Sequence, residues 1–127
     1  MKHRTLHVKV GEPPATALKQ VAETMKALDR GEMVEPYFSV GFANVGQLFA
    51  IFTPRRWELL AALRQNGPAS IAELARLLGR NYKNVHDDIS KLIEWHVVEK
   101  EEGGRGQVFS PYSEILVDVR LPDRQAA

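Results

Sequence analysis

The feature that most constrains the fold is a series of three helix-start signals that ends in a glycine-rich turn. The first signal, Thr53-Pro54, supplies an N-cap hydroxyl and a proline at the first helical position, where its missing N–H costs nothing. Asn66-Gly67-Pro68 ends this helix, because glycine adopts the left-handed cap conformation and proline cannot continue a helix. The sequence therefore predicts a helix from Pro54 to about Gln65.

Two further helices follow at short intervals. Ser70 and Glu73 form a capping box before a short helix with one apolar face, which Gly79 stops. Asn81 caps a third helix that ends near His96. The apolar residues predicted to form the shared core of these helices are Leu60, Leu63, Leu74, Leu78, Val85, Ile89 and Leu92.

A hairpin is predicted after the third helix. Two β-prone segments, Val97–Lys100 and Gln107–Phe109, flank the glycine-rich residues 101–106. Three helices, the last two joined by a tight turn, and then a hairpin have the element order of a winged helix-turn-helix domain. We therefore expect an α+β fold with this domain over residues 44–121. The alternative is a domain of the same topology that binds only protein.

An N-terminal strand-helix extension is predicted over residues 1–43. Residues Thr5–Val10 alternate as a half-buried strand does, and Pro36–Phe42 is aromatic and β-prone. Asn44 and Gln47 can cap a short helix, Ile115–Leu121 alternates as a strand, and residues 122–127 should fray. Between the first two β-prone segments, helical spacing gives an apolar face that Gly31 closes. The alternative is that this helix folds back on its own domain, but we expect the face to form a homodimer interface: Leu18, Val21, Met25 and Leu28.

Composition excludes several classes of protein. Hydrophobic residues make up 44% of the chain, too many for a wholly disordered protein. No apolar run approaches the roughly 18 residues that span a bilayer, so no membrane partner and a cytoplasmic location are expected. The absence of cysteine excludes disulfides, thiolate nucleophiles and cysteine-ligated metals.

Catalytic signals are absent from the sequence, and we expect neither an enzyme nor a cofactor. The four histidines show no metal-binding spacing with carboxylates, and no phosphate loop or nucleophile motif occurs. Gly103-Gly104-Arg105-Gly106 is better explained as a turn, because no helix follows it. Asp87 and Asp88 point about 100° apart on a helix, a poor arrangement for a shared metal or an acid-base pair.

The net charge of +1 conceals two opposed segments. Residues 54–83 hold six basic and two acidic side chains, a net charge of +4. Residues 84–102 hold two lysines and six acids, a net charge of −4. The first segment favours a phosphate partner, whereas the acidic residues of the second are a solvated face or a docking surface for a basic protein.

Three segments resemble a known family: FTPRRWELLAAL, GPASIAELARLLGRNYKNVHDDISKL and GGRGQVFSPYSEI. The stretch from about Phe38 to Leu121 is similar to a prokaryotic winged-helix family of DNA-binding regulators, usually described as MarR-like. The resemblance implies a transcriptional regulator, and in some members an antitoxin beside a small toxin. Two residues depart from the pattern: Asp87 stands where a basic residue is expected, and His96 where glycine commonly closes the helix.

A helical wheel with 100° per residue separates the two faces of the third helix. Tyr82 falls near the core side, where a buried wedge is favoured over base stacking. His86 is interpreted as a partly buried packing residue and not as a base reader. Asp88 is expected to form an ion pair with Arg76 or Arg80. The residues predicted to face DNA are Ser70, Arg80, Asn81, Lys83, Asn84, Asp87, Ser90 and Lys91, together with Arg105 at the hairpin tip. Arg80 is predicted either to contact a phosphate or to form a local ion pair, with neither favoured. Arg105 is predicted either to enter a minor groove or to remain an exposed arginine without a contact, again with neither favoured.

The sequence thus predicts a homodimeric, sequence-specific regulator that binds double-stranded DNA. The third helix, residues 81–95, would enter the major groove, and the wing, residues 101–106, would reach the adjacent groove or backbone. The alternative is an antitoxin-like protein-interaction module that neutralises a basic toxin.

Overall fold

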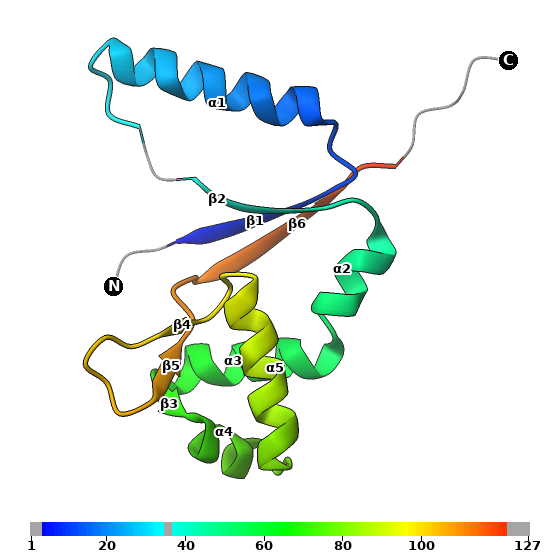
Figure 1. Ribbon diagram of the computed structural model, residues 1–127, viewed down its shortest axis with the longest axis vertical. Coiled ribbons are helices and arrows are strands. Elements are labelled where there is room, and N and C mark those ends of the chain that lie inside the picture. The colour runs from blue at the N-terminus through cyan, green and yellow to red at the C-terminus, as the bar shows by residue number, and fades with distance from the viewer. Residues whose placement is uncertain (1–3, 35–36, 122–127) are drawn as a thin grey trace, which may run out of the picture. The chain divides into compact units, whose positions relative to one another are not determined.

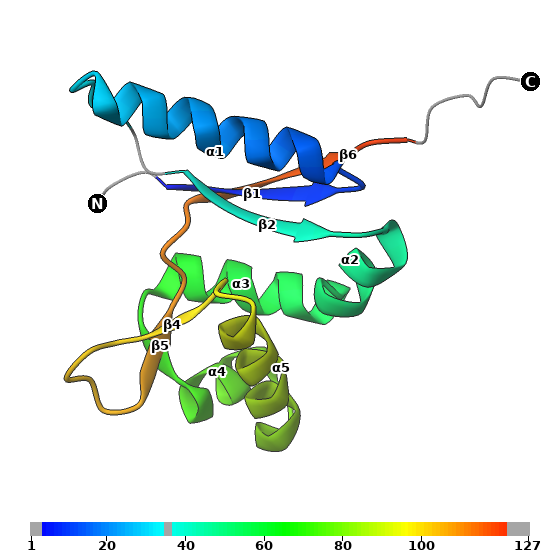
Figure 2. The same ribbon diagram turned by 45° about the horizontal axis from the view of Figure 1, so that its top comes forward.

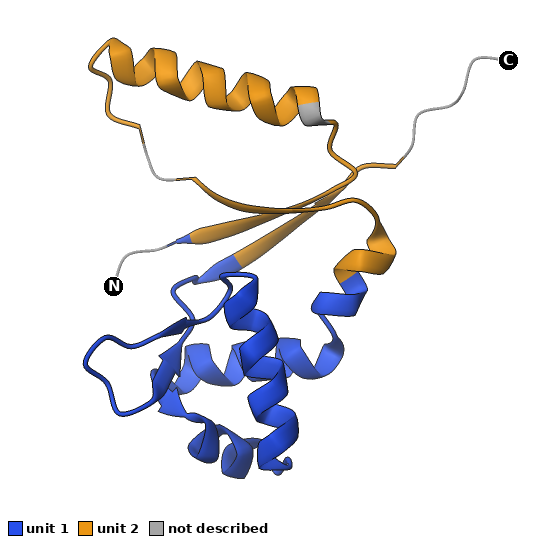
Figure 3. Cartoon of the chain, viewed as in Figure 1, with its two compact units in different colours: residues 1–4, 49–114 blue, residues 5–48, 115–127 orange. Residues whose placement is uncertain are grey.

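The computed structural model describes residues 4–34 and 37–121 and has a mixed α+β fold. The chain divides into two compact units (Figure 3). Unit 1 contains Phe49–Glu114 and the N-terminal residues to Arg4, and unit 2 contains Thr5–Leu48 and the residues from Ile115 onward.

Unit 2 is built around a sheet with the strand order β2-β1-β6 (Figure 1). Strands β1 (Thr5–Val10) and β2 (Phe38–Phe42) pair in parallel, with Val8 opposite Val40. Strand β6 (Glu114–Val119) lies on the other side of β1. The predicted alternation in β1 is confirmed, because Leu6, Val8 and Val10 are buried.

Helix α1 (Pro14–Asp29) is the crossover that connects the parallel strands β1 and β2, and it lies along one face of the sheet (Figure 2). Pro13 is its N-cap and makes no side-chain capping hydrogen bond. Gly31 follows the helix with a φ of 76°, a left-handed conformation that glycine adopts at no steric cost. The predicted helix and its glycine stop are therefore confirmed.

Helix α2 (Val45–Ile51) begins where the sequence predicts it. The Asn44 side chain accepts a hydrogen bond from the Gln47 backbone N–H at 2.8 Å, and the Gln47 side chain accepts one from Ala43 at 2.8 Å. This reciprocal capping satisfies backbone donors that the first turn of a helix leaves unpaired.

Unit 1 contains helices α3 (Pro54–Asn66), α4 (Ile71–Leu78) and α5 (Tyr82–Glu94). Short strands form an antiparallel sheet with the order β3-β5-β4. Strand β3 was not predicted. Strand β4 is shorter than the predicted Val97–Lys100, because Val97 and Val98 are buried in the core but pair with no strand. The bounds are Ala69–Ser70 for β3, Glu99–Lys100 for β4 and Gln107–Phe109 for β5.

The predicted core of unit 1 is confirmed apart from Leu78, which is half-buried. Leu63, Leu74, Val85, Ile89 and Leu92 are almost completely buried. The core also includes apolar residues that the helical pattern alone did not single out: Leu59, Val97, Val98 and Val108.

The two units differ from the predicted division into residues 1–43 and 44–121. Unit 2 extends to Leu48 and also takes in β6, where the Arg120 N–H donates to the Val10 carbonyl at 3.0 Å and joins the residues after β6 to the N-terminal strand. The predicted fraying tail, residues 122–127, lies outside the described residues. None of the helices in the described part has the length and apolarity that a bilayer crossing requires.

Candidate functional site

Helices α4 and α5 are held in place by specific end signals. The Ser70 hydroxyl accepts a hydrogen bond from the Glu73 N–H at 3.1 Å, and the Glu73 carboxylate accepts one from the Ser70 N–H at 3.4 Å. Gly79 ends α4 in the left-handed conformation, with φ 62° and ψ 35°. The Asn81 side chain then caps α5 by accepting from the Lys83 N–H at 2.8 Å. Ser70 and Glu73 thus fix the start of α4, and Gly79 and Asn81 bound the tight turn between the two helices.

Helix α5 has one buried and one exposed face. Val85, Ile89 and Leu92 anchor it, each no more than 1% exposed. The opposite face is polar and accessible, and it carries the side chains of Lys83, Asn84, His86, Asp87, Ser90 and Glu94. A helix of 13 residues is about 20 Å long, so this face offers a rigid polar surface of that length.

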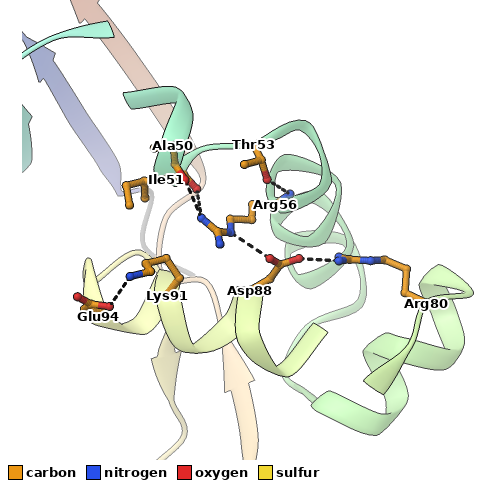
Figure 4. Close-up of polar contacts among 8 residues, drawn as sticks. All are labelled: Ala50, Ile51, Thr53, Arg56, Arg80, Asp88, Lys91 and Glu94. Carbon is orange, nitrogen blue, oxygen red and sulfur yellow. Dashed lines mark hydrogen bonds and ion pairs between the residues drawn. The ribbon is translucent and has the colours of Figure 1, made fainter. Parts of the chain in front are cut away.

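An ion-pair cluster attaches α5 to the rest of unit 1 (Figure 4). Asp88 Oδ2 accepts from Arg80 Nη2 at 2.7 Å, and Asp88 Oδ1 accepts from Arg56 Nε at 3.1 Å. The three side chains are only 10–15% exposed. One carboxylate therefore joins α5 to α3 and to the α4–α5 turn.

Arg56 also connects this cluster to the end of α2. Its Nη1 atom donates to the carbonyls of Ala50 at 3.1 Å and Ile51 at 2.8 Å (Figure 4). The last carbonyls of a helix have no partner within it, so the guanidinium satisfies them. The pairing of Asp88 with Arg80 matches the prediction, whereas Arg56 was missed, since 32 residues separate it from Asp88.

The cluster changes the interpretation of Arg80, which the sequence left open between phosphate and an ion pair. Its side chain is 10% exposed, the guanidinium is bound to Asp88, and atoms Nε and Nη1 are buried without a hydrogen-bond partner. Arg80 is therefore a positioning residue that holds the start of α5, and its guanidinium is engaged by Asp88.

Two predictions of burial on α5, for Tyr82 and for His86, are wrong. Tyr82 is 55% exposed instead of forming a buried wedge, and the His86 side chain is 52% exposed. The two rings lie 6.2 Å apart between centroids, one turn apart on α5. Tyr82 is the first residue of α5, and helical side chains point toward the N-terminus, so its ring projects beyond the helix end and not into the core.

The other predicted DNA-facing residues fall into two groups. Ser70 and Asn81 are N-caps, and Lys91 is half-buried and paired with Glu94 at 3.0 Å. Lys83, Asn84, Asp87 and Ser90 are exposed on α5, where Asp87 lies 3.8 Å from His86 Nδ1.

The tip of the hairpin in unit 1 depends on glycines with positive φ. The Glu101 N–H donates to the Gln107 carbonyl at 2.9 Å, and Gly103 and Gly106 have φ values of 66° and 75°. Arg105 is exposed at this tip.

Before the hairpin, His96 has a φ of 62°. This confirms that histidine adopts the left-handed conformation at the position where glycine commonly closes the helix.

A shallow hollow beside the hairpin is rich in acidic residues. Glu99, Glu101 and Glu102 line it together with Lys100 and His96. Across the described residues, no three histidine or carboxylate side chains come together in a way that could hold a metal ion. The predicted dimer residues Leu18, Val21, Met25 and Leu28 belong to unit 2 and are exposed.

A family model that carries the description HVO_A0114 matches residues 51–117, more than half of the chain. The chain belongs to the HVO_A0114 family. The part of this HVO_A0114 protein that the family shares runs from the last residue of α2 into β6, so it includes the ion-pair cluster, α5 and the hairpin. Curated proteins and solved structures gave no match to the chain. The MarR-like resemblance stays a prediction.

Proposed function

We propose that this protein is a transcriptional regulator that binds double-stranded DNA through a winged helix-turn-helix in unit 1. The observation that carries the proposal is the exposed polar face of α5, opposite a face buried to 1% or less. A rigid helix with polar side chains on its free face suits the major groove, which is wide enough to admit it.

The order of elements supports the same proposal. A short capped helix and a tight glycine turn precede α5, and a two-stranded hairpin follows it. In winged helix-turn-helix proteins the second helix braces the recognition helix, and the hairpin reaches a neighbouring groove or the backbone. Arg105, at the exposed hairpin tip, is then the residue that enters a minor groove or binds a phosphate.

Specific roles follow for the exposed residues of α5. Lys83 lies in the first turn, where its ammonium and the free backbone N–H groups favour a phosphate. Asn84 and Ser90 offer hydrogen bonds to base edges. Asp87 either accepts a hydrogen bond from a cytosine amino group or repels the backbone. Tyr82, exposed beside this surface, adds an apolar ring that can contact a sugar or a thymine methyl group.

A second function is favoured by the acidic hollow beside the hairpin. Glu99, Glu101 and Glu102 line a concave surface that would attract a basic protein, as an antitoxin attracts its toxin. Such a partner would bind the hairpin base and leave α5 free. Glu101→Lys would then weaken the protein complex while leaving DNA binding the same or tighter.

The proposal is tested by duplex binding at several salt concentrations. Affinity should fall linearly on a log-log plot against salt, because bound lysine and arginine displace condensed counterions. Lys83→Ala should weaken binding and reduce the slope by about 1. The control is Lys19→Ala, which removes the same charge from the exposed surface of α1.

A second variant separates the two roles of Asp87. If the carboxylate reads a base, Asp87→Arg loses preference for the cognate site, by about 1 to 3 kcal/mol, while gaining general affinity. If it only repels phosphate, all duplexes bind more tightly. If neither promoter nor random duplexes bind at low salt, the DNA-binding proposal is wrong and the protein-interaction function replaces it.

A further inference from the structure

Helix α1 presents an apolar stripe that its own unit leaves uncovered. Leu18 is 71% exposed, Val21 57%, Met25 61% and Leu28 56%. The surface of a monomeric protein rarely gathers apolar side chains into one contiguous patch of this kind without a binding role. We call these four residues the α1 stripe.

The sheet beneath α1 explains why the stripe stays exposed. The sheet face that looks toward the helix is polar, with Lys9 Nζ bound to Asp118 Oδ2 at 3.2 Å and Ser39 beside them. A hollow of about 460 Å³ separates this floor from the helix, and three stripe residues line it: Val21, Met25 and Leu28. Leu18 does not line this hollow. Val21, Met25 and Leu28 thus face the sheet across the hollow and Leu18 lies outside it, and all four side chains remain more than half exposed.

The spacing of the stripe is symmetric about Glu23. Leu18 and Leu28 are five residues from it on either side, and Val21 and Met25 are two residues from it. The intervals of three, four and three residues are those of alternating a and d positions in a heptad. When two copies of such a helix run antiparallel about a two-fold axis, Leu18 meets Leu28 of the second copy, and Val21 meets its Met25. Every stripe residue then has an apolar partner.

The flanks of the stripe allow two helices to approach closely. With Leu18 at an a position, the flanking e and g positions within α1 are small and uncharged except for Asp29: Ala15, Ala17, Ala22 and Thr24. The charged residues Lys19, Glu23, Lys26 and Arg30 fall about 150° away from the centre of the stripe. Antiparallel pairing therefore brings no like charges together.

One charge at the flank is complementary to the opposite end of the helix. In the antiparallel arrangement Asp29 lies beside the first turn of α1 in the second copy. That turn contains no acidic residue, and its N-cap, Pro13, makes no side-chain hydrogen bond. A carboxylate near a helix N-terminus is favourable, because the partial positive charge of the helix dipole is located there.

We propose that a second copy of this chain covers the α1 stripe, with the two α1 helices packed antiparallel about a two-fold axis. The interface is isologous, since each residue of one copy contacts the symmetric residue of the other. Part of the second copy also closes the hollow between α1 and the sheet. This inference does not depend on DNA binding, because the stripe belongs to unit 2 and the α5 surface to unit 1.

Light scattering after gel filtration tests the dimer. The wild-type chain at tens of micromolar should have twice the mass of one copy. Val21→Glu combined with Met25→Glu should have the mass of one copy, because the charges would be buried against apolar partners. The control, Lys19→Glu, introduces the same residue on the opposite face and should keep the dimer. Circular dichroism should give the same helix content for all three proteins.

Cross-linking tests the antiparallel geometry. The chain has no cysteine, so Val21→Cys and Met25→Cys each introduce a single thiol. An oxidised mixture of the two variants should give a covalent dimer containing both, while each variant alone should cross-link at least tenfold less. Cross-linking of Val21→Cys with itself would contradict the antiparallel pair. A monomeric wild-type chain, or a dimer that survives the double glutamate substitution, would overturn the proposal.

Discussion

At the scale of single residues, Asp88 is the polar side chain that joins α5 to α3 and to the α4–α5 turn. Its two carboxylate oxygens bind two guanidinium groups, and all three side chains are at most 15% exposed. Removing one partner of a buried ion pair is strongly destabilising, because the remaining charges cannot recover their hydration. Here two arginines would lose the same carboxylate. The net stabilisation by the intact cluster is therefore smaller than the destabilisation expected when Asp88 is removed.

Asp88→Ala should lower the free energy of unfolding by up to about 3 kcal/mol, the lower end of the range for a fully buried pair, because this cluster is only partly buried. Asp87→Ala is a matched control, because it makes the same chemical change at the next position on an exposed side chain. That control should change stability by no more than about 0.5 kcal/mol. Urea denaturation of both variants measures the difference. Equal effects would mean that the cluster does not hold α5 in solution.

Tyr112 should make the stability of unit 1 sensitive to alkaline pH. Burial raises the pKa of its hydroxyl, and the nearby Glu99 carboxylate raises it further. The folded state therefore holds the proton more tightly than the unfolded state does. The resulting stability is fully present below the unfolded pKa of about 10 and is lost as pH rises through the folded value. Tyr112→Phe should reduce the loss of thermal stability between about pH 9 and pH 12. If Tyr112→Phe loses as much thermal stability as the wild type over this pH range, other groups cause the alkaline loss.

At the scale of elements, the sequence predicted those helices and strands whose ends carry their own chemistry. Thr53, Ser70 and Asn81 each accept the capping hydrogen bond expected of them. Strand β3 was not predictable because it has two residues and exists through pairing with β5, 37 residues later. The partner Arg56 was missed for the same reason. Local signals determine where elements begin and end, while contacts distant in sequence determine what they touch.

Ser70 belongs to both the fold and the proposed DNA surface, and two substitutions separate these roles. Ser70→Ala removes the acceptor for the Glu73 N–H and should cost about 1 kcal/mol of stability. Ser70→Asp keeps an acceptor at the N-cap, so stability should stay near that of the wild type. Its negative charge should weaken duplex binding if Ser70 lies near a phosphate. Unfolding and duplex-binding measurements on both variants decide this, and unchanged binding by Ser70→Asp would exclude Ser70 from the surface.

At the scale of the whole molecule, the two units divide the proposed work. Unit 1 offers the exposed face of α5, and unit 2 offers the α1 stripe. Because the family match covers residues 51–117, unit 1 is the part shared across the HVO_A0114 family, whereas α1 lies outside the match. The amphipathic pattern of α1 was visible in the sequence, but its exposure was not. A helical stripe looks the same whether its own domain or a second copy buries it.

The proposed dimer and the proposed DNA binding together predict the salt dependence of a monomeric variant. Each copy contributes its own lysine and arginine contacts to phosphate, and the log-log slope of affinity against salt is proportional to the number of contacts. Val21→Glu combined with Met25→Glu should therefore bind duplexes with about half the wild-type slope. Lys19→Glu, which also adds negative charge to α1 but keeps the dimer, should retain the full slope. A monomeric variant with the full slope would mean that a single copy makes all of the phosphate contacts, and the dimer would then have no part in holding DNA.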